Sequence, residues 1–298
     1  NVPLVVALLA LSFPILPTTR EARPQPLDPV GALLALAGLV ALVFGVIEGP
    51  EQGWGAPVTV GAFVLAAALL VGFVRWELAH RTPTLDPRLF RVPGFGAGAG
   101  AITVAFFSLF GMFFLLTQYL QFVRGYSALE AGVRTIPNAL AMVLVSPQAP
   151  RLVARFGARP TMRAGFVLTA AGFALLATAT PDSSILVIVT ALVCTGSGMA
   201  LIAPAASQHV VGSLPLSKAG VGSAVNDVTR EVGGALGIAV LGSIVATVYR
   251  DAGLPGESIG ATIGAVRAGA VPPADVPAVL AAAGDAFTDG TRLAFATM

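Results

Sequence analysis

The chain has 298 residues, of which 56% are hydrophobic and only 11% are charged, against about 25% charged residues in ordinary soluble domains. A soluble globule of this size cannot hide so much apolar surface, so the composition argues against a water-soluble enzyme or binding module. The formal net charge of +2 excludes the strongly basic surface that nucleic acid requires as a partner.

Long apolar runs separated by short charged clusters predict helices that cross a membrane, because a hydrocarbon core takes about 20 apolar residues per helix. The runs lie at about 2–17, 29–47, 57–75, 98–122, 128–150, 160–180, 184–210 and 219–249, and a ninth starts near Phe287. The predicted fold class is therefore all-α, a polytopic transmembrane bundle of about eight spans plus the start of a ninth. We expect the first and last spans to be truncated.

Arginine and lysine predict the orientation, since positive residues concentrate on the cytoplasmic side. One side receives twelve of them: Arg20, Arg23, Arg75, Arg81, Arg88, Arg91, Arg151, Arg155, Arg159, Arg163, Lys218 and Arg230. The other side receives five: Arg124, Arg134, Arg250, Arg267 and Arg292. We therefore place residues 250–285 outside the cytoplasm, as a loop or short surface helix with no active site.

Polar side chains inside the fourth and fifth runs are candidates for a substrate cavity, because burial in hydrocarbon is costly unless they face a cavity or a partner. Gln118 and Gln121 share a helix face near the outer end of the fourth run. In the fifth run, Asn138 follows Pro137, a residue that permits kinking. Two interpretations remain open: contact with a substrate in a bending, cavity-lining bundle, or hydrogen bonds to neighbouring helices.

The eighth run opens with the densest cluster of polar and ionisable groups at membrane depth. Asn226 is a further cavity candidate, and Asp227 precedes Arg230 by three residues, close enough for an ion pair on one helix face. The pair is either a neutralising structural bridge near the cytoplasmic interface or a gating and proton-relay element. Both interpretations stay open at this stage.

Several motifs point away from catalysis. The glycine run from Gly94 to Gly100 lacks the preceding strand of a dinucleotide-binding loop. Glycines four apart, in that run and at Gly233 and Gly237, instead favour close helix packing. The sequence holds no P-loop, HExxH helix or serine nucleophile elbow. We expect no enzyme, no cofactor and no metal, and the absence of a P-loop favours transport driven by an ion gradient.

Four stretches resemble the major facilitator superfamily, in particular its fourteen-span drug:proton antiporter branch. The opening NVPLVVALLALSFPILP at 1–17 resembles the family's sixth span. LDPVGALLALAGLVALVFGVIEGPEQGW at 27–54 resembles the first of that branch's two extra central spans. LTQYLQFVRGYSALEAGVRTIP at 116–137 is similar to its ninth-to-tenth span junction, and GVGSAVNDVTREVGGALGIAVLG at 220–242 to its thirteenth span. The resemblance covers nearly the whole chain.

A cytoplasmic loop also matches part of the superfamily motif G-x-x-x-D-R-x-G-x-R. Arg155, Gly157 and Arg159 fit three of its positions, whereas Pro150 and Ala154 depart from it. The family uses this loop as a latch between helices during alternating access. Because Ala154 removes the acidic partner, the resemblance does not carry the latch role over in full.

The resemblance implies a domain plan and a function. Residues 1–17 end a truncated span of the first bundle, residues 18–93 form a cytoplasmic linker and two extra central spans, and residues 94–298 form the C-terminal bundle with its last span truncated. With the missing N-terminal half of the same chain, it would export cationic or amphipathic molecules across the bacterial inner membrane by proton antiport. The partners are the lipid bilayer, a small-molecule substrate and protons.

Other functions remain open. The same frame suits a dedicated exporter of a siderophore, a lipid or a self-made antibiotic. From different classes, a membrane-embedded enzyme would need convergent acidic, His or Ser groups at one depth, and a structural subunit would show no response to substrate.

Overall fold

A computed structural model describes residues 2–15, 28–80, 83, 85–215 and 219–298. Within these residues the regular structure is entirely helical, which confirms the predicted all-α class. The elements are α1 Val2–Ile15, α2 Pro29–Gln52, α3 Pro57–Ala79, η1 Pro87–Arg91, α4 Pro93–Gln118, the π-helical turn η2 Tyr119–Val123, α5 Ala128–Val145, η3 Ser146–Gln148, α6 Ala149–Phe156, α7 Ala158–Leu176, α8 Ile185–Gly212, α9 Ala219–Asp251, α10 Ile259–Arg267 and α11 Val276–Ala296.

Six helical stretches in the described part of the chain are long and apolar enough to cross a membrane. They are Pro29–Gln52, Pro57–Ala79, Pro93–Val123, Ala128–Phe156, Ile185–Gly212 and Gly220–Asp251. The expected runs at 2–17 and 160–180 are also helical, as α1 and α7, but α1 has 14 described residues and α7 opens with Arg159 and Arg163. The predicted linker falls largely on residues 16–27, outside the described residues.

The helix expected as a ninth span is α11, and it begins earlier than predicted. The sequence predicts a start near Phe287, but α11 begins at Val276. Pro277 and Asp285 interrupt the apolar run in the sequence, but a proline is tolerated in the first turn of a helix and so does not delay its start. The segment before it contains the short helix α10, which matches the second of the two alternatives, a loop or a short helix, that the sequence left open.

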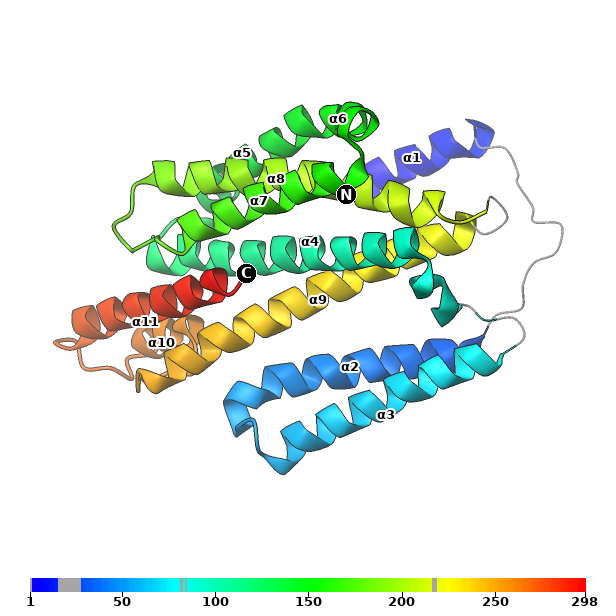
Figure 1. Cartoon of the computed structure of the whole chain (residues 1–298). Helices are drawn as coiled ribbons and strands as arrows, with labels where there is room; N and C mark the ends of the chain where they lie inside the picture. The colour runs from blue at the N-terminus through cyan, green and yellow to red at the C-terminus, as the bar shows by residue number, and fades with distance from the viewer. Residues whose placement is uncertain (1, 16–27, 81–82, 84, 216–218) are drawn as a thin grey trace.

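Helix α4 lies in the middle of the bundle (Figure 1), packed against α8 on one side and α9 on the other. It is central because its buried side chains belong to two separate hydrophobic clusters. Phe95 and Ile102 pack with Met199 and Ile202 of α8, and Leu115 lies in a second cluster with residues of α7, α8, α9 and α11. Burial on several sides gives α4 an apolar surface over most of its circumference.

Helices α2 and α3 form a separate antiparallel pair, called here the central hairpin (residues 29–79), which lies beyond α9 (Figure 1). Asp28 caps α2: its carboxylate accepts the backbone N–H of Gly31 at 2.9 Å and the indole N–H of Trp76 on α3 at 2.9 Å. A Cβ on Gly31 would meet the carboxylates of Asp28 and Glu77 at 2.6 and 2.7 Å. The end of the hairpin at Asp28 is thus closed by a buried polar network.

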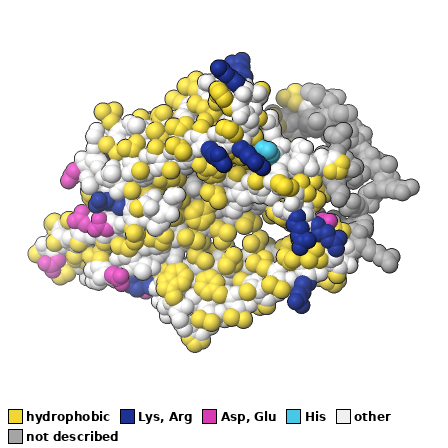
Figure 2. All heavy atoms as spheres, viewed as in Figure 1, with side chains coloured by type: hydrophobic (Ala, Val, Ile, Leu, Met, Phe, Trp, Pro, Cys, Tyr) yellow, Lys and Arg dark blue, Asp and Glu magenta, His cyan; other side chains and the backbone are white. Residues whose placement is uncertain are grey.

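Charges separate toward the two ends of the bundle. In Figure 2 the visible acidic side chains gather mainly at the end where α10 and α11 lie, whereas most of the visible Lys and Arg side chains lie toward the opposite end. Arg124 and Arg250 end α4 and α9 at the same end as α10. We call this the outer end, because the arginine count places it outside the cytoplasm. Arg20, Arg23, Arg81 and Lys218 of that count lie outside the described residues.

Candidate functional site

Two glycines on α9 set the framework of the site by bringing its backbone against α4. A Cβ on Gly233 would lie 2.4 Å from the carbonyl oxygen of Thr103, and one on Gly237 would lie 2.1 Å from that of Phe107. Only glycine fits such distances, so the predicted packing role of this pair is confirmed. Gly100, by contrast, faces open space and Gly96 contacts the backbone of Phe90, so the other predicted pair does not join two spans.

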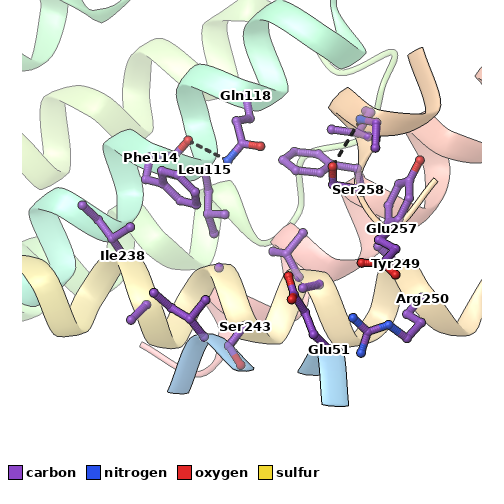
Figure 3. Close-up of a pocket in the computed structure, with 18 residues that line it drawn as sticks. Glu51, Phe114, Leu115, Gln118, Ile238, Ser243, Tyr249, Arg250, Glu257 and Ser258 are labelled. Carbon is purple, nitrogen blue, oxygen red and sulfur yellow. Dashed lines mark hydrogen bonds between the residues drawn. The ribbon is translucent and has the colours of Figure 1, made fainter. Parts of the chain in front are cut away.

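A cavity of about 460 Å³ opens at the outer end between α2, α4, α9, α10 and α11. We call it the outer pocket. Figure 3 shows α4 and α10 above it and α9 with the end of α2 below. Its walls are mostly apolar and aromatic, including Phe114 and Leu115 of α4, Ile238 of α9 and Phe287 of α11. A volume of this size lies in the range of small-molecule sites, about 300–1,000 Å³.

Charged and polar groups stand around the rim of the outer pocket. Glu51 comes from the last turn of α2, Arg250 from the end of α9, and Glu257 from the segment before α10. Figure 3 shows Glu51 reaching from α2 toward the space below Gln118, with Arg250 beside it. Both glutamates are exposed. Ser243 lies in the wall with a buried hydroxyl that has no hydrogen-bond partner among the described residues.

Two hydrogen bonds hold α10 over the outer pocket. Tyr249 is 1% exposed, and its hydroxyl bonds the hydroxyl of Thr262 on α10 at 2.7 Å. Ser258 begins α10 by accepting the backbone N–H of Ala261. These bonds fix the short helix over the end of α9, so the pocket has a defined roof.

One of the two predicted glutamines lines the outer pocket. Gln118 contributes its side chain to the wall, with its amide donating to the carbonyl of Phe114 one turn earlier at 3.5 Å. Gln121 lies in the π-helical turn η2 and is absent from the pocket lining. The extra residue of a π-turn rotates the following positions around the axis, which separates the two side chains.

The two predicted asparagines join helices in this structure. Asn138 is 1% exposed, and its amide donates to the carbonyl of Leu192 and the hydroxyl of Thr195, both at 3.0 Å on α8. Asn226 accepts the hydroxyl of Ser207 on α8 at 2.7 Å. Of the two interpretations offered by the sequence, these contacts match the hydrogen bonds between neighbouring helices.

The predicted ion pair between Asp227 and Arg230 is not formed. Asp227 is exposed and accepts the amide of Asn226 at 3.4 Å. Arg230 instead places its guanidinium 4.7 Å from the centroid of the Phe106 ring on α4. The spacing of three allows the two side chains to meet, but the aromatic face on the adjacent helix offers the planar guanidinium a competing contact.

The cytoplasmic loop motif lies between α6 and α7. Gly157 has φ +89°, a conformation that L side chains rarely adopt, and its N–H bonds the carbonyl of Val153 to end α6. Arg155 lies 5.0 Å from the ring centroid of its neighbour Phe156. The glycine therefore serves the sharp turn, and Arg155 and Arg159 stand on the two sides of it.

An outer-end network was not anticipated from the sequence. The Arg124 guanidinium donates to the carbonyls of Pro181 and Ser183 at 2.7 and 2.9 Å, which binds the end of α4 to the α7–α8 loop. Its hydrogen bond to the hydroxyl of Tyr126 lowers the pKa of that phenol. The Arg134 guanidinium stacks on the ring of the same tyrosine, 3.7 Å from its centroid.

The sequence also missed the two pocket glutamates. Glu51 was interpreted only as a boundary between spans, and Glu257 lies in the segment where no active site was expected. The structure places part of the pocket wall in that segment. A usable clue was present, since two acidic residues flank apolar spans at the end of the bundle that carries few arginines.

A model of the Major Facilitator Superfamily matches residues 5–238. Multidrug resistance protein Stp of Mycobacterium tuberculosis is 34% identical over 83% of this chain and 46% of its own length. Multidrug efflux pump LfrA of Mycolicibacterium smegmatis is 30% identical, over 99% of this chain and 58% of its own. The tetracenomycin C resistance and export protein of Streptomyces glaucescens is 32% identical, over 92% and 53%. The chain spans about half the length of the curated relatives it matches.

Proposed function

The chain belongs to the Major Facilitator Superfamily, and from this premise we propose that it forms the C-terminal portion of a bacterial exporter of small amphipathic or cationic molecules. The family assignment confirms a multi-pass bacterial membrane protein and a transporter rather than an enzyme. Its relatives bear the names of multidrug resistance, efflux and export proteins. Drug export by the whole protein is our proposal.

The observation that carries the proposal is a stripe of exposed polar side chains on α9. Ser223, Asp227 and Glu231 all face outward from the described part of the bundle. Glu231 lies about 18 Å from the start of α9, at 1.5 Å per residue, and the rest of the helix to Asp251 spans about another 30 Å, the thickness of the hydrocarbon core. Counted from Asp251, Glu231 thus lies at the inner edge of the hydrocarbon core, where its carboxylate needs water, headgroups or another part of the protein beside it rather than lipid chains.

We therefore propose that this stripe lines the cytoplasmic part of a transport path between two bundles. In the domain plan, residues 1–17 end the first bundle, residues 18–93 link to two extra central spans of the fourteen-span branch, and residues 94–298 form the second bundle. The missing N-terminal half would cover the α9 stripe. Protons would move inward along this path as substrate moves out, and Asp227 and Arg230 are the candidate residues for coupling and gating.

The alternating-access role of the cytoplasmic loop is part of the same proposal. Arg155, Gly157 and Arg159 would contact the other bundle in one conformation and release it in the other. Gln121 and Asn138, which do not line the outer pocket, remain cavity candidates for a second conformation in which α5 bends at Pro137.

The test is ethidium accumulation in a bacterium that lacks its own efflux pumps. The full-length parent protein, with expression checked by blot, should lower ethidium accumulation relative to empty vector. A protonophore should abolish the difference, because it removes the gradient. Unchanged accumulation despite good expression would contradict multidrug export and favour a dedicated exporter, as the relative named for tetracenomycin C export suggests.

A further inference from the structure

We propose that the outer pocket is a binding site for an amphipathic organic monocation, in which Glu51 of the central hairpin and Glu257 before α10 select the charge. The inference rests on the proposed export function, because it assigns a ligand class and two specificity residues to the same protein. It gives the central hairpin a part in ligand recognition, beyond that of a spacer between bundles.

The shape of the pocket suits an organic molecule with a large apolar body. Its volume of about 460 Å³ is enclosed by Phe114, Leu115, Ile238, Val245, Ile259 and Phe287. Burying apolar ligand surface against such walls is favourable by roughly 25 cal/mol per Å². A hydrated metal ion finds no cluster of ligands here, since the described residues hold no group of three His, Cys, Asp or Glu side chains arranged for a metal.

The charge of the rim selects a cation. Glu51 and Glu257 supply two negative charges and Arg250 one positive charge, which leaves a net charge of −1. Among the described residues one side-chain ion pair is formed, between Arg292 and Asp289 at 3.5 Å. Arg250 therefore forms no direct ion pair with either glutamate. A ligand with a single positive charge would neutralise the site, whereas an anion would meet two carboxylates.

Aromatic and hydroxyl groups complete the recognition. Phe114, which is 38% exposed, lines the pocket, and aromatic faces attract organic cations within about 6 Å. The hydroxyl of Ser243 lies in the same wall without a partner in the described part of the chain, and Gln118 supplies an amide. These groups allow a ligand to orient its polar atoms while its body remains in the apolar wall.

The origin of Glu51 makes the proposal specific to this architecture. It is contributed by α2, which packs against α9 from outside the C-terminal bundle (Figure 1). Asp28 at the other end of α2 already accepts hydrogen bonds from Gly31 and Trp76. Glu51 has an exposed carboxylate at a cavity, so it is available to a ligand where Asp28 is not.

The experiment measures the binding of tetraphenylphosphonium to the purified full-length protein by isothermal titration calorimetry. Glu51→Gln and Glu257→Gln should each weaken binding about two- to fivefold, the effect of one partly solvated charge contact, and the double variant about tenfold. The neutral probe triphenylphosphine oxide should bind these variants as it binds the wild type. Ile238→Trp, which fills the pocket, should weaken the binding of both probes.

Glu48→Gln is the matched control. Glu48 lies one turn before Glu51 on α2, hydrogen-bonds Gln52 and is absent from the pocket lining. The Glu48→Gln variant changes the net charge of the protein by the same amount as Glu51→Gln. An effect of long-range electrostatics alone would therefore appear equally in both variants. We expect it to bind tetraphenylphosphonium within about 1.5-fold of wild type, since separation and solvent screen its charge.

Three outcomes overturn the proposal: no binding of tetraphenylphosphonium by the wild type, wild-type affinity in the double glutamate variant, or an equal loss in Glu48→Gln. The proposed function is judged separately by ethidium accumulation. If the protein exports ethidium but the glutamate variants bind tetraphenylphosphonium like the wild type, the pocket assignment is wrong and the exporter proposal stands. If tetraphenylphosphonium binding depends on the glutamates but the protein does not export ethidium, the pocket assignment stands and the exporter proposal is wrong.

Discussion

Helix α9 meets α4 on one face and α2 on another, and the two contacts are built differently. Against α4, Gly233 and Gly237 lie directly on the backbone of Thr103 and Phe107, with no room for a methyl group. Against α2, side chains separate the helices and leave two cavities, the outer pocket and a second one of about 480 Å³ between Val46, Trp54 and Ile244. One helix thus carries both a close-packed face and an open one.

The difference indicates a division of tasks. Close backbone approach gives dispersion contacts that hold helices together where lipid removes the hydrophobic drive between them. An open contact contributes less to stability but leaves space that a ligand can fill. We expect substitutions at the α4–α9 contact to remove folded protein, and substitutions at the α2–α9 contact to change ligand binding while the fold persists.

The largest effect is expected for Gly237→Leu. Its side chain would enter the space held by the carbonyl of Phe107 and force α4 and α9 apart, since overpacking costs about 1–3 kcal/mol or more. The full-length protein should lose its monodisperse peak in size-exclusion chromatography. Gly220→Leu is the control, because Gly220 on the same helix faces open space. If Gly237→Leu and Gly220→Leu elute alike, the α4–α9 contact is not the close-packed contact that the fold requires.

A smaller effect is expected for Asn138→Leu, which tests a third kind of contact. The substitution removes two hydrogen bonds from α5 to α8, and such bonds between membrane helices are each worth about 0.6–1.7 kcal/mol. The thermal midpoint of the purified protein should fall while the protein still folds. Gln148→Leu, at an exposed residue bonded only to its own helix turn, should leave the midpoint unchanged. No fall for Asn138→Leu would mean that packing alone holds α5.

Trp76→Phe should loosen the central hairpin and spare the bundle. It removes the indole donor to Asp28 while keeping an aromatic ring. Hydrogen exchange should quicken at the start of α2 and stay unchanged in α4 and α9. Trp54→Phe changes the exposed tryptophan at the other end of the hairpin and serves as the control. Faster exchange throughout α9 would show that the hairpin and the bundle unfold together.

The smallest expected effect is a pH dependence of the thermal midpoint, which arises from Asp28. The hydrogen bond from the backbone N–H of Gly31 holds the pKa of Asp28 below its usual value of 3.8. The folded state thus favours the ionised form, so its stabilisation is present above about pH 4 and is lost as the pH falls through the lowered pKa. The thermal midpoint of Asp28→Asn should vary less than that of the wild type between pH 5 and pH 3. If the thermal midpoints of the wild type and of Asp28→Asn fall in parallel between pH 5 and pH 3, Asp28 is not the source of the pH dependence.

Sequence patterns predicted the helices more successfully than the contacts between them. The run at 184–210 became α8 at Ile185–Gly212, because unbroken apolar length suffices to define a spanning helix. The partners of Asn138 and Arg230 depend on which helices are neighbours, and hydropathy carries no such information. The outer pocket combines residues from five helices, and its acidic members looked like ordinary span boundaries in the sequence. Spacing along one helix predicted a contact between Asp227 and Arg230 that a ring on another helix replaces.

The length of α9 makes bilayer thickness a variable for this protein. At 33 residues the helix is about 50 Å long, some 20 Å longer than a typical hydrocarbon core. The excess is met by tilt or by protrusion of one end, and lipid chain length sets the balance between them. Short-chain lipids would leave Glu231 among hydrated headgroups, and long-chain lipids would draw it toward the acyl region. Membrane composition would then tune how much of the acidic stripe meets water.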